Sequence, residues 1–287
     1  MRAVLLAVVL VTTQLVAMPP AAAAAPVPAP GRAPARIVSL APSVTETLFA
    51  LGVGPRVVAV SDYCDYPPEA RRLPKIGSFL DPSVEAIVAQ RPDVVIGVPS
   101  PGNHTAVETL QNLGIRVAVS DPEHLADLAP VTRMIAAAAG VPEAGERLIA
   151  EIDRGMDAVR ARVATQPLRR VLMAIGQDPL VAVGDTSFLG ELIVAARGIN
   201  VAPPGNPWPL VNVEYVVARD PEVIIDSSMG TEEGSAAARF WERLPSIAAV
   251  REHRVYAFRD YRALRPGPRL PAAFANLARL IHPEAWR

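Results

Sequence analysis

Cysteine is almost absent from this chain of 287 residues, which contains one, Cys64. A single thiol cannot form an intramolecular disulfide, so ordinary side-chain packing must hold the fold together. Lysine and arginine do not cluster, and the formal net charge is −1, which argues against nucleic acid or an anionic membrane surface as a partner. The chain also lacks HExxH, CxxC, Walker-type and GxSxG patterns, and its four histidines have no ligand-like spacing. No familiar metal, phosphate or nucleophile motif is therefore legible.

The first residues have the composition of an export signal. Met1-Arg2 precedes an apolar run that continues to Met18, and the small-residue block Ala21 to Ala25 follows. This order predicts a secretory signal over residues 1–25 that is cleaved, because the run is short for a membrane span. An uncleaved anchor is the alternative. No cysteine follows the run, so no lipid attachment is expected, and the Pro/Ala-rich residues 26–35 are expected to form a flexible leader.

The rest of the chain alternates between short apolar runs and amphipathic segments. Helix 45–51 is expected to be capped by Ser43 or Thr45, and helix 84–90 by Ser83. Short continuous apolar strands between helices are typical of parallel sheets that are covered on both faces. The chain thus reads as one α/β unit, a long helix and a second α/β unit. Strands are expected at 36–40, 57–60, 93–97, 115–119 and 170–175, and further helices at 105–113 and 143–164.

An internal repeat supports two related halves. Residues 83–97 read SVEAIVAQRPDVVIG, and residues 212–226 read NVEYVVARDPEVIID. Both copies predict a helix, a proline and a buried strand. Apolar matches alone are common wherever a capped helix runs into a buried strand, but the pair Glu85 and Glu214 also matches. Each glutamate lies in the first turn of its helix, where a carboxylate favours the helix dipole. Alternatively, two equivalent lobes each present one acid to a common partner.

Several runs together resemble a known family. The motifs are RIVSLAPSVTETLFALG, SDYCDYPPEA, LPKIG, PSVEAIVAQRPDVVI and NPWPLVNVEYVVARDPEVII. They are similar to the periplasmic substrate-binding proteins of cobalamin and iron-chelate ABC importers, and DYPP and WPxV favour the cobalamin branch. The resemblance covers the chain from about Arg36 onwards. It implies an α/β fold with two Rossmann-like lobes and mainly parallel sheets, joined by one long rigid helix. The expected divisions are an N-terminal lobe over 36–142, a linking helix over 143–165 and a C-terminal lobe over 166–287.

The same resemblance implies a function. The chain is expected to be a periplasmic protein, not an enzyme, that binds cobalamin (vitamin B12) between its lobes and delivers it to the membrane permease of an ABC importer. It is expected to act as a monomer, released after signal cleavage, without nucleic acid, resident cofactor or bound metal other than the cobalt of its ligand. By the family pattern, Glu85 and Glu214 would meet arginines on the two copies of the permease.

A corrinoid is large, flat and amphipathic, so its site should offer aromatic faces and a few polar groups. Aromatic residues are scarce, yet several lie in loops where strands are expected to end. Packing within the loops, without a ligand, is the alternative for each. Tyr63 and Trp208 match family ligand contacts, and residues 260–264 align with the contact loop of the second lobe. The candidate ligand residues are Tyr63, Phe79, Trp208, Asp260, Tyr261, Arg262, Ala263 and Leu264, with Tyr66 close by.

Other functions stay open at this stage. Haem would need an axial ligand, for which Tyr63 could serve, and a ferric siderophore would need converging arginines such as Arg262, Arg265 and Arg269. Cys64 is expected to be a small buried residue, with a thiolate ligand to cobalt or haem as the alternative. An exported α/β enzyme is the alternative of another class. Its acids would come from Asp178, Asp185, Asp226 and Asp260.

Overall fold

A computed structural model of the protein describes residues 33–227 and 239–287, apart from the side chains of Tyr261 and Leu264. The expected signal and most of the leader lie outside these residues. The first sheet has four parallel strands in the order β2-β1-β3-β4. Side chains alternate between its faces, so Val38 and Val95 join one apolar cluster while Ile37 and Val94 join another. The strands are β1 (Ile37–Ser39), β2 (Val57–Val60), β3 (Val94–Gly97) and β4 (Val117–Val119).

Helices cover both faces of this sheet. Helices α2 (Val84–Ala89) and α3 (His104–Asn112) lie on one face, and α1 (Pro42–Ala50) and α4 (Leu128–Ala138) contribute to the cluster on the other. Ser83 caps α2 as expected, since its hydroxyl accepts a hydrogen bond from the Ala86 N–H. The expected cap of α1 is wrong. Its N-cap is Ala41, without a side-chain bond, because Pro42 begins the helix with a φ that suits the first turn.

The second sheet is mixed. Its order is β6-β5-β8-β9, with β7 also paired to β5. Among the pairs of described strands in this sheet, β5–β6 alone is antiparallel. Helices α6 (Phe188–Ala195) and α10 (Leu270–Ile281) contribute to the cluster on one face, and α7 (Val213–Arg219) and α9 (Ala248–Arg251) to that on the other. The strands are β5 (Arg169–Gln177), β6 (Leu180–Ala182), β7 (Gly198–Asn200), β8 (Val223–Asp226) and β9 (Val255–Ala257).

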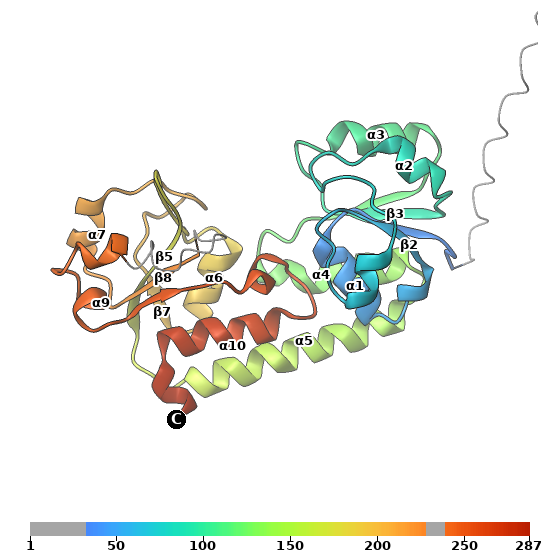
Figure 1. The fold of residues 1–287 in the computed structure, drawn as a ribbon. Helices are drawn as coiled ribbons and strands as arrows, with labels where there is room; N and C mark the ends of the chain where they lie inside the picture. Colours follow the sequence, from blue (N-terminus) through green and yellow to red (C-terminus); the bar gives the residue numbers. More distant parts are fainter. Residues whose placement is uncertain (1–32, 228–238) are drawn as a thin grey trace, which may run out of the picture.

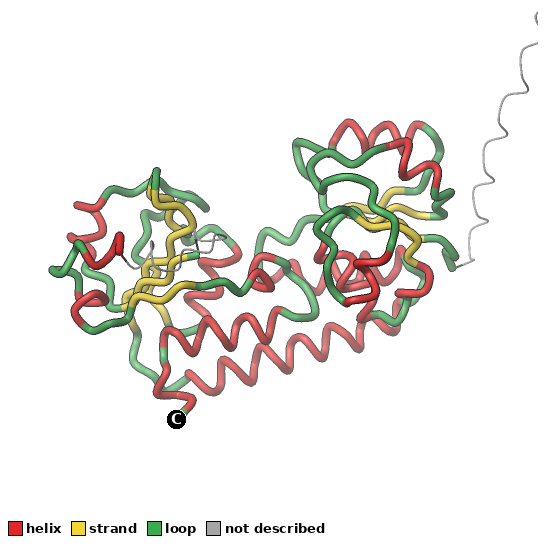
Figure 2. The backbone as a smooth tube through the Cα atoms, viewed as in Figure 1, coloured by secondary structure: helices red, strands yellow, loops and turns green. Residues whose placement is uncertain are grey.

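One long helix joins the two lobes. Helix α5 (Pro142–Val163) runs along the base of the molecule beside α10, as Figures 1 and 2 show. Its two glycines allow close contacts, because a Cβ on Gly145 would lie 2.6 Å from the Ala136 Cβ of α4, and one on Gly155 2.7 Å from the Pro271 Cβ of α10. A single apolar cluster continues from α1 and α4 through α5 to α10 and β8. The two lobes therefore share one apolar core through α5 and α10.

The internal repeat is present in the structure. Helices α2 and α7 each lead into a central strand, β3 or β8, and each lies on the sheet face away from α5. The backbone repeats in detail, since the turns after the helices hold Arg91 at φ 48° and Asp220 at φ 43°.

Within the described residues, no helix has the length and apolarity to cross a membrane. The short 3-10 turns are η1 (Gly54–Arg56), η2 (Pro68–Arg72), η3 (Leu125–Asp127), η4 (Tyr261–Leu264) and η5 (Pro283–Trp286).

Candidate functional site

The candidate residues lie on loops that follow the carboxyl ends of parallel strands. Strand β2 leads into the loop with Tyr63 and Tyr66, β7 into the segment with Trp208, and β9 into residues 258–269. In open α/β sheets, ligands bind in the crevice outside these ends. We call residues 61–67 the aromatic loop and residues 260–269 the bridging loop.

Cys64 anchors the aromatic loop to the interior of the first lobe. Its sulfur is buried and lies 3.1 Å from the Thr45 hydroxyl and 3.2 Å from that of Ser61. On either side, Tyr63 is 67% exposed and Tyr66 42%. The expectation that Cys64 is a small buried residue is confirmed, and the two tyrosines of the same loop both lie at the surface.

The backbone of this loop is held from its other side by Lys75. The ammonium lies 3.1 Å from the Cys64 carbonyl oxygen and 3.4 Å from that of Ser61. Phe79, on the next turn, is half-buried and packs against the shared core, while its carbonyl oxygen accepts a bond from the Asn103 amide. Phe79 therefore offers a ligand only part of its ring.

In the second lobe, Trp208 stands on an extended segment that pairs with the end of β6. The Ala182 N–H donates to the Pro209 carbonyl and the Gly184 N–H to that of Pro207. Gly184 is required here, because a Cβ would lie 1.7 Å from the Asn206 carbonyl oxygen. With its backbone fixed in this way, Trp208 remains 45% exposed.

The start of the bridging loop is an internal ion pair. Both nitrogens of the Arg262 fork bond Asp260, and the Asn276 amide adds a third bond at 2.7 Å. Burial alone would raise the pKa of Asp260, but the bonds from Arg262 and Asn276 outweigh it and lower the pKa. Ala263 is fully buried and offers no surface in this conformation. The side chains of Tyr261 and Leu264 lie outside the described part of the structure.

The rest of the bridging loop reaches across to the first lobe. The guanidinium groups of Arg265 and Arg269 both bond Glu46 on α1, and Arg265 also bonds Asp65 of the aromatic loop at 2.6 Å. Burial works against ionisation of Asp65, but the Arg265 guanidinium holds its pKa below the ordinary value. Arg262, Arg265 and Arg269, the arginines considered for a siderophore, are therefore all paired with carboxylates of the chain itself. Sequence reasoning had not identified Glu46 as part of the site.

Three of the four acids considered for an enzyme, Asp185, Asp226 and Asp260, are also hydrogen-bonded within the fold. Asp226 is buried at the end of β8 and accepts bonds from the Gln177 amide and the Trp241 indole. Asp185 accepts from the Gly205 N–H at 2.8 Å. Among the residues that the structure describes, no three or more histidines, cysteines and acids gather in a way that would suit a metal ion.

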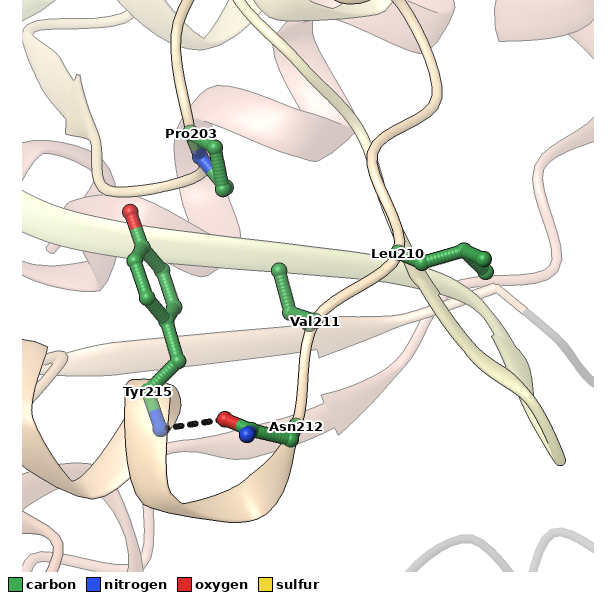
Figure 3. A pocket seen from close by; sticks show the side chains of 5 residues that line it. All are labelled: Pro203, Leu210, Val211, Asn212 and Tyr215. Carbon is green, nitrogen blue, oxygen red and sulfur yellow. Dashed lines mark hydrogen bonds between the residues drawn. The ribbon is translucent and has the colours of Figure 1, made fainter.

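A pocket of about 430 Å³ lies on the second lobe beside α7, and Figure 3 shows its lining. Asn212 caps the helix by accepting from the Tyr215 N–H at 2.8 Å, and the Tyr215 hydroxyl donates to the Val201 carbonyl. Leu210, which also lines the pocket, is exposed. Glu214 and its counterpart Glu85 are both exposed in the first turns of α7 and α2. The pocket is lined by Pro203, Leu210, Val211, Asn212 and Tyr215.

Comparison with known proteins points to one family. The profile described as "Periplasmic binding protein" matches residues 37–261. The chain is 31% identical to the vitamin B12-binding protein of Yersinia pestis (strain Pestoides F) over 219 residues, 76% of this chain and 77% of that protein.

Solved structures agree in fold. The periplasmic vitamin B12-binding protein of Vibrio cholerae aligns with a TM-score of 0.75 and 26% identity, over 88% of this chain and 98% of that one. The periplasmic haem-binding protein of Roseiflexus sp. RS-1 aligns with a TM-score of 0.76 and 31% identity, over 87% of this chain and 98% of that one. Both relatives are similar to nearly the whole described chain.

Proposed function

We propose a function for this chain from one premise: it belongs to the periplasmic binding protein family, whose profile spans residues 37–261. Members of this family bind solutes for transport and are not enzymes, and the chain is a solute-binding protein in the same sense. Two of the acids considered for an enzyme are hydrogen-bonded within the fold, which agrees with this role. Asp226 and Asp185 already accept hydrogen bonds from the chain's own groups.

The proposed ligand is cobalamin, bound between the two lobes. One observation carries the proposal: each lobe presents an exposed aromatic side chain, Tyr63 or Trp208, on a loop at the carboxyl end of its sheet. A flat amphipathic ligand suits such faces. The paired state of Arg265 and Arg269 further favours a ligand that does not require free arginines. Named relatives that bind vitamin B12 support the same choice.

Haem is the second candidate. The haem-binding relative from Roseiflexus is as similar in fold as the cobalamin-binding one and has the higher identity of the two. Tyr63, with its exposed phenol, is the group in the aromatic loop that would serve as an axial ligand. To distinguish the two candidates, the protein is mixed with hydroxocobalamin or with haemin, and unbound ligand is then removed. The absorption spectrum of the protein shows which ligand it has retained.

Replacement of Trp208 should weaken cobalamin binding. We expect one-to-one binding by calorimetry, and Trp208→Ala should cost more than about 1 kcal/mol of binding free energy, because an exposed aromatic face is lost from the site. The matched control is Trp286→Ala, which removes an indole that packs with Arg162 and Arg279 at the base of the molecule. Absence of heat with cobalamin, alongside clear binding of haemin, would overturn the cobalamin proposal.

We also propose where the protein works and what receives its ligand. Residues 1–25 would direct export to the periplasm and be removed, residues 36–142 and 166–287 would form the two lobes, and residues 143–165 would join them. The loaded monomer would then dock on the permease of an ABC importer through Glu85 and Glu214. In support, both acids are exposed and lie in equivalent places on the repeated helices. A permease made of two copies related by two-fold symmetry would contact one of these glutamates with each copy.

Charge reversal at these two acids should impair transport without affecting the ligand. Glu85→Arg or Glu214→Arg should reduce uptake, and the double variant should dock least, since rim charges set encounter and register. Pull-down on importer reconstituted in lipid measures docking, and calorimetry checks that ligand affinity is unchanged. Glu151→Arg, exposed on α5 at the opposite side of the sheets, is the control and should dock normally. Normal docking of the double variant would show that both acids only favour their helix dipoles.

A further inference from the structure

Glu46 is a carboxylate on the buried side of helix α1. Its side chain is 1% exposed, and its neighbours Val44, Thr45, Thr47 and Leu48 on α1 are buried as well. A carboxylate removed from water in this way is costly unless it is paired and hydrogen-bonded. Its partners should therefore be fixed features of the fold.

Both partners come from the other lobe. Arg269 holds the carboxylate with a two-pronged fork, its Nε lying 2.7 Å from Oε2 while an Nη bonds Oε1. The Arg265 Nη1 lies 3.3 Å from Oε1. The backbone also comes close, since a Cβ on Gly267 would lie 3.5 Å from the Thr47 hydroxyl. The bridging loop thus lies against the first turns of α1 and is held there by one charge.

The same two arginines also hold the aromatic loop. The Arg269 guanidinium lies 3.8 Å from the centre of the Tyr66 ring, a cation–π contact. The Arg265 Nη1 lies 2.6 Å from the Asp65 Oδ1, and its Nη2 lies 3.4 Å from the Tyr63 carbonyl oxygen. Each arginine therefore touches Glu46 on one side and the aromatic loop on the other.

We infer that Glu46 is a positioning residue that sets the geometry of the aromatic loop and the bridging loop together. Its negative charge holds two like-charged guanidinium groups side by side, and those groups fix the loops of both lobes. Without that charge Arg265 and Arg269 repel each other, and nothing else in this network pulls them onto α1. The inference rests on the proposed ligand site, because the two loops it couples are those assigned to the ligand.

Glu46→Gln tests the coupling, because glutamine keeps the shape and removes the charge. In the ligand-free protein, amide hydrogen exchange should become about tenfold faster in residues 61–67 and in residues 260–269 together, while β3 and β8 stay protected. Glu146→Gln is the control. It removes the charge from an exposed ion pair with Arg133 and should leave both loops unchanged. An equal increase throughout the chain, or an increase in one loop alone, would overturn the inference.

Ligand binding gives the second readout. With hydroxocobalamin and haemin as probes, whichever ligand the native protein retains should bind Glu46→Gln about tenfold more weakly, since the two loops are no longer held together. Equal affinity of the two proteins would overturn the inference while the proposed function stands. If the native protein retains neither probe but the exchange of both loops still rises, the proposed ligand falls and the positioning role of Glu46 stands. Arg269→Lys, which keeps the charge but loses the fork and the flat face, should give a smaller change in exchange.

Discussion

Phe274→Ala is expected to lower the free energy of unfolding by about 3–5 kcal/mol, because it empties a fully buried site in the helix pair at the base. Phe274 has no exposed surface and lies on α10, which packs against both α5 and the second lobe's sheet. Its cluster extends into the first lobe through α5 and α4. The loss should therefore appear in one cooperative transition for both lobes, measured by urea denaturation with fluorescence and circular dichroism.

Val194→Ala serves as the matched control for this substitution. Val194 lies on the neighbouring helix α6 and is 60% exposed, so its truncation should change stability by less than about 0.5 kcal/mol. Two separate transitions, with only one shifted by Phe274→Ala, would show that the lobes have independent cores. A loss below about 1 kcal/mol would mean that the site collapses around the missing ring.

Local signals in the sequence predicted much of the first half of the fold. A serine before an apolar helix and a glycine after it mark helix ends through hydrogen bonds that involve neighbouring residues only. Helix α2 begins after Ser83 as expected, and the long helix observed at Pro142–Val163 is within one residue of the predicted 143–164. The internal repeat could also be recognised from the sequence alone, because its two copies lie in the same chain and can be aligned with each other. It correctly placed α7 and β8 in the second half.

The antiparallel strand β6 was not anticipated. It is three residues long and pairs with β5 across a short turn at Asp178-Pro179. No alternating pattern is visible in so short a run, and its pairing depends on β5 continuing to Gln177. The segment with Trp208 then pairs with it through an isolated bridge between Val181 and Leu210. The pairing that holds the Trp208 segment in place therefore could not be predicted from local sequence patterns.

The contacts that couple the candidate loops were hidden for a different reason. Glu46 and Arg269 are 223 residues apart, and no local pattern links them. A signal was nevertheless present, since Glu46 stands between the apolar residues Val44 and Leu48 near the start of an expected helix, where a buried charge must find a partner. Arg265 and Arg269 were considered only as groups that could bind a siderophore. The structure shows that they are the partners of Glu46 and Asp65.

Arg269→Ala should be among the most destabilising single changes outside the apolar core. It leaves Glu46, whose side chain is 1% exposed, with only the longer bond from Arg265, and it removes the cation above the Tyr66 ring. Breaking a buried pair from one side costs about 3–5 kcal/mol, because a buried charge stays uncompensated. We expect a loss near the lower end, about 3 kcal/mol, since Arg265 remains.

The decisive comparison is a double-mutant cycle with Glu46→Gln, measured by urea denaturation. Glu46→Gln alone should cost less than Arg269→Ala, because both guanidinium groups it releases are partly exposed and can be hydrated. With Glu46 already replaced by a neutral glutamine, removal of Arg269 leaves no buried charge unpaired. The double variant should therefore be more stable than Arg269→Ala alone. The coupling energy should be about 1–3 kcal/mol. If the two single losses simply add, the pair contributes nothing beyond its separate contacts, and the unpaired buried charge cannot explain the cost of Arg269→Ala.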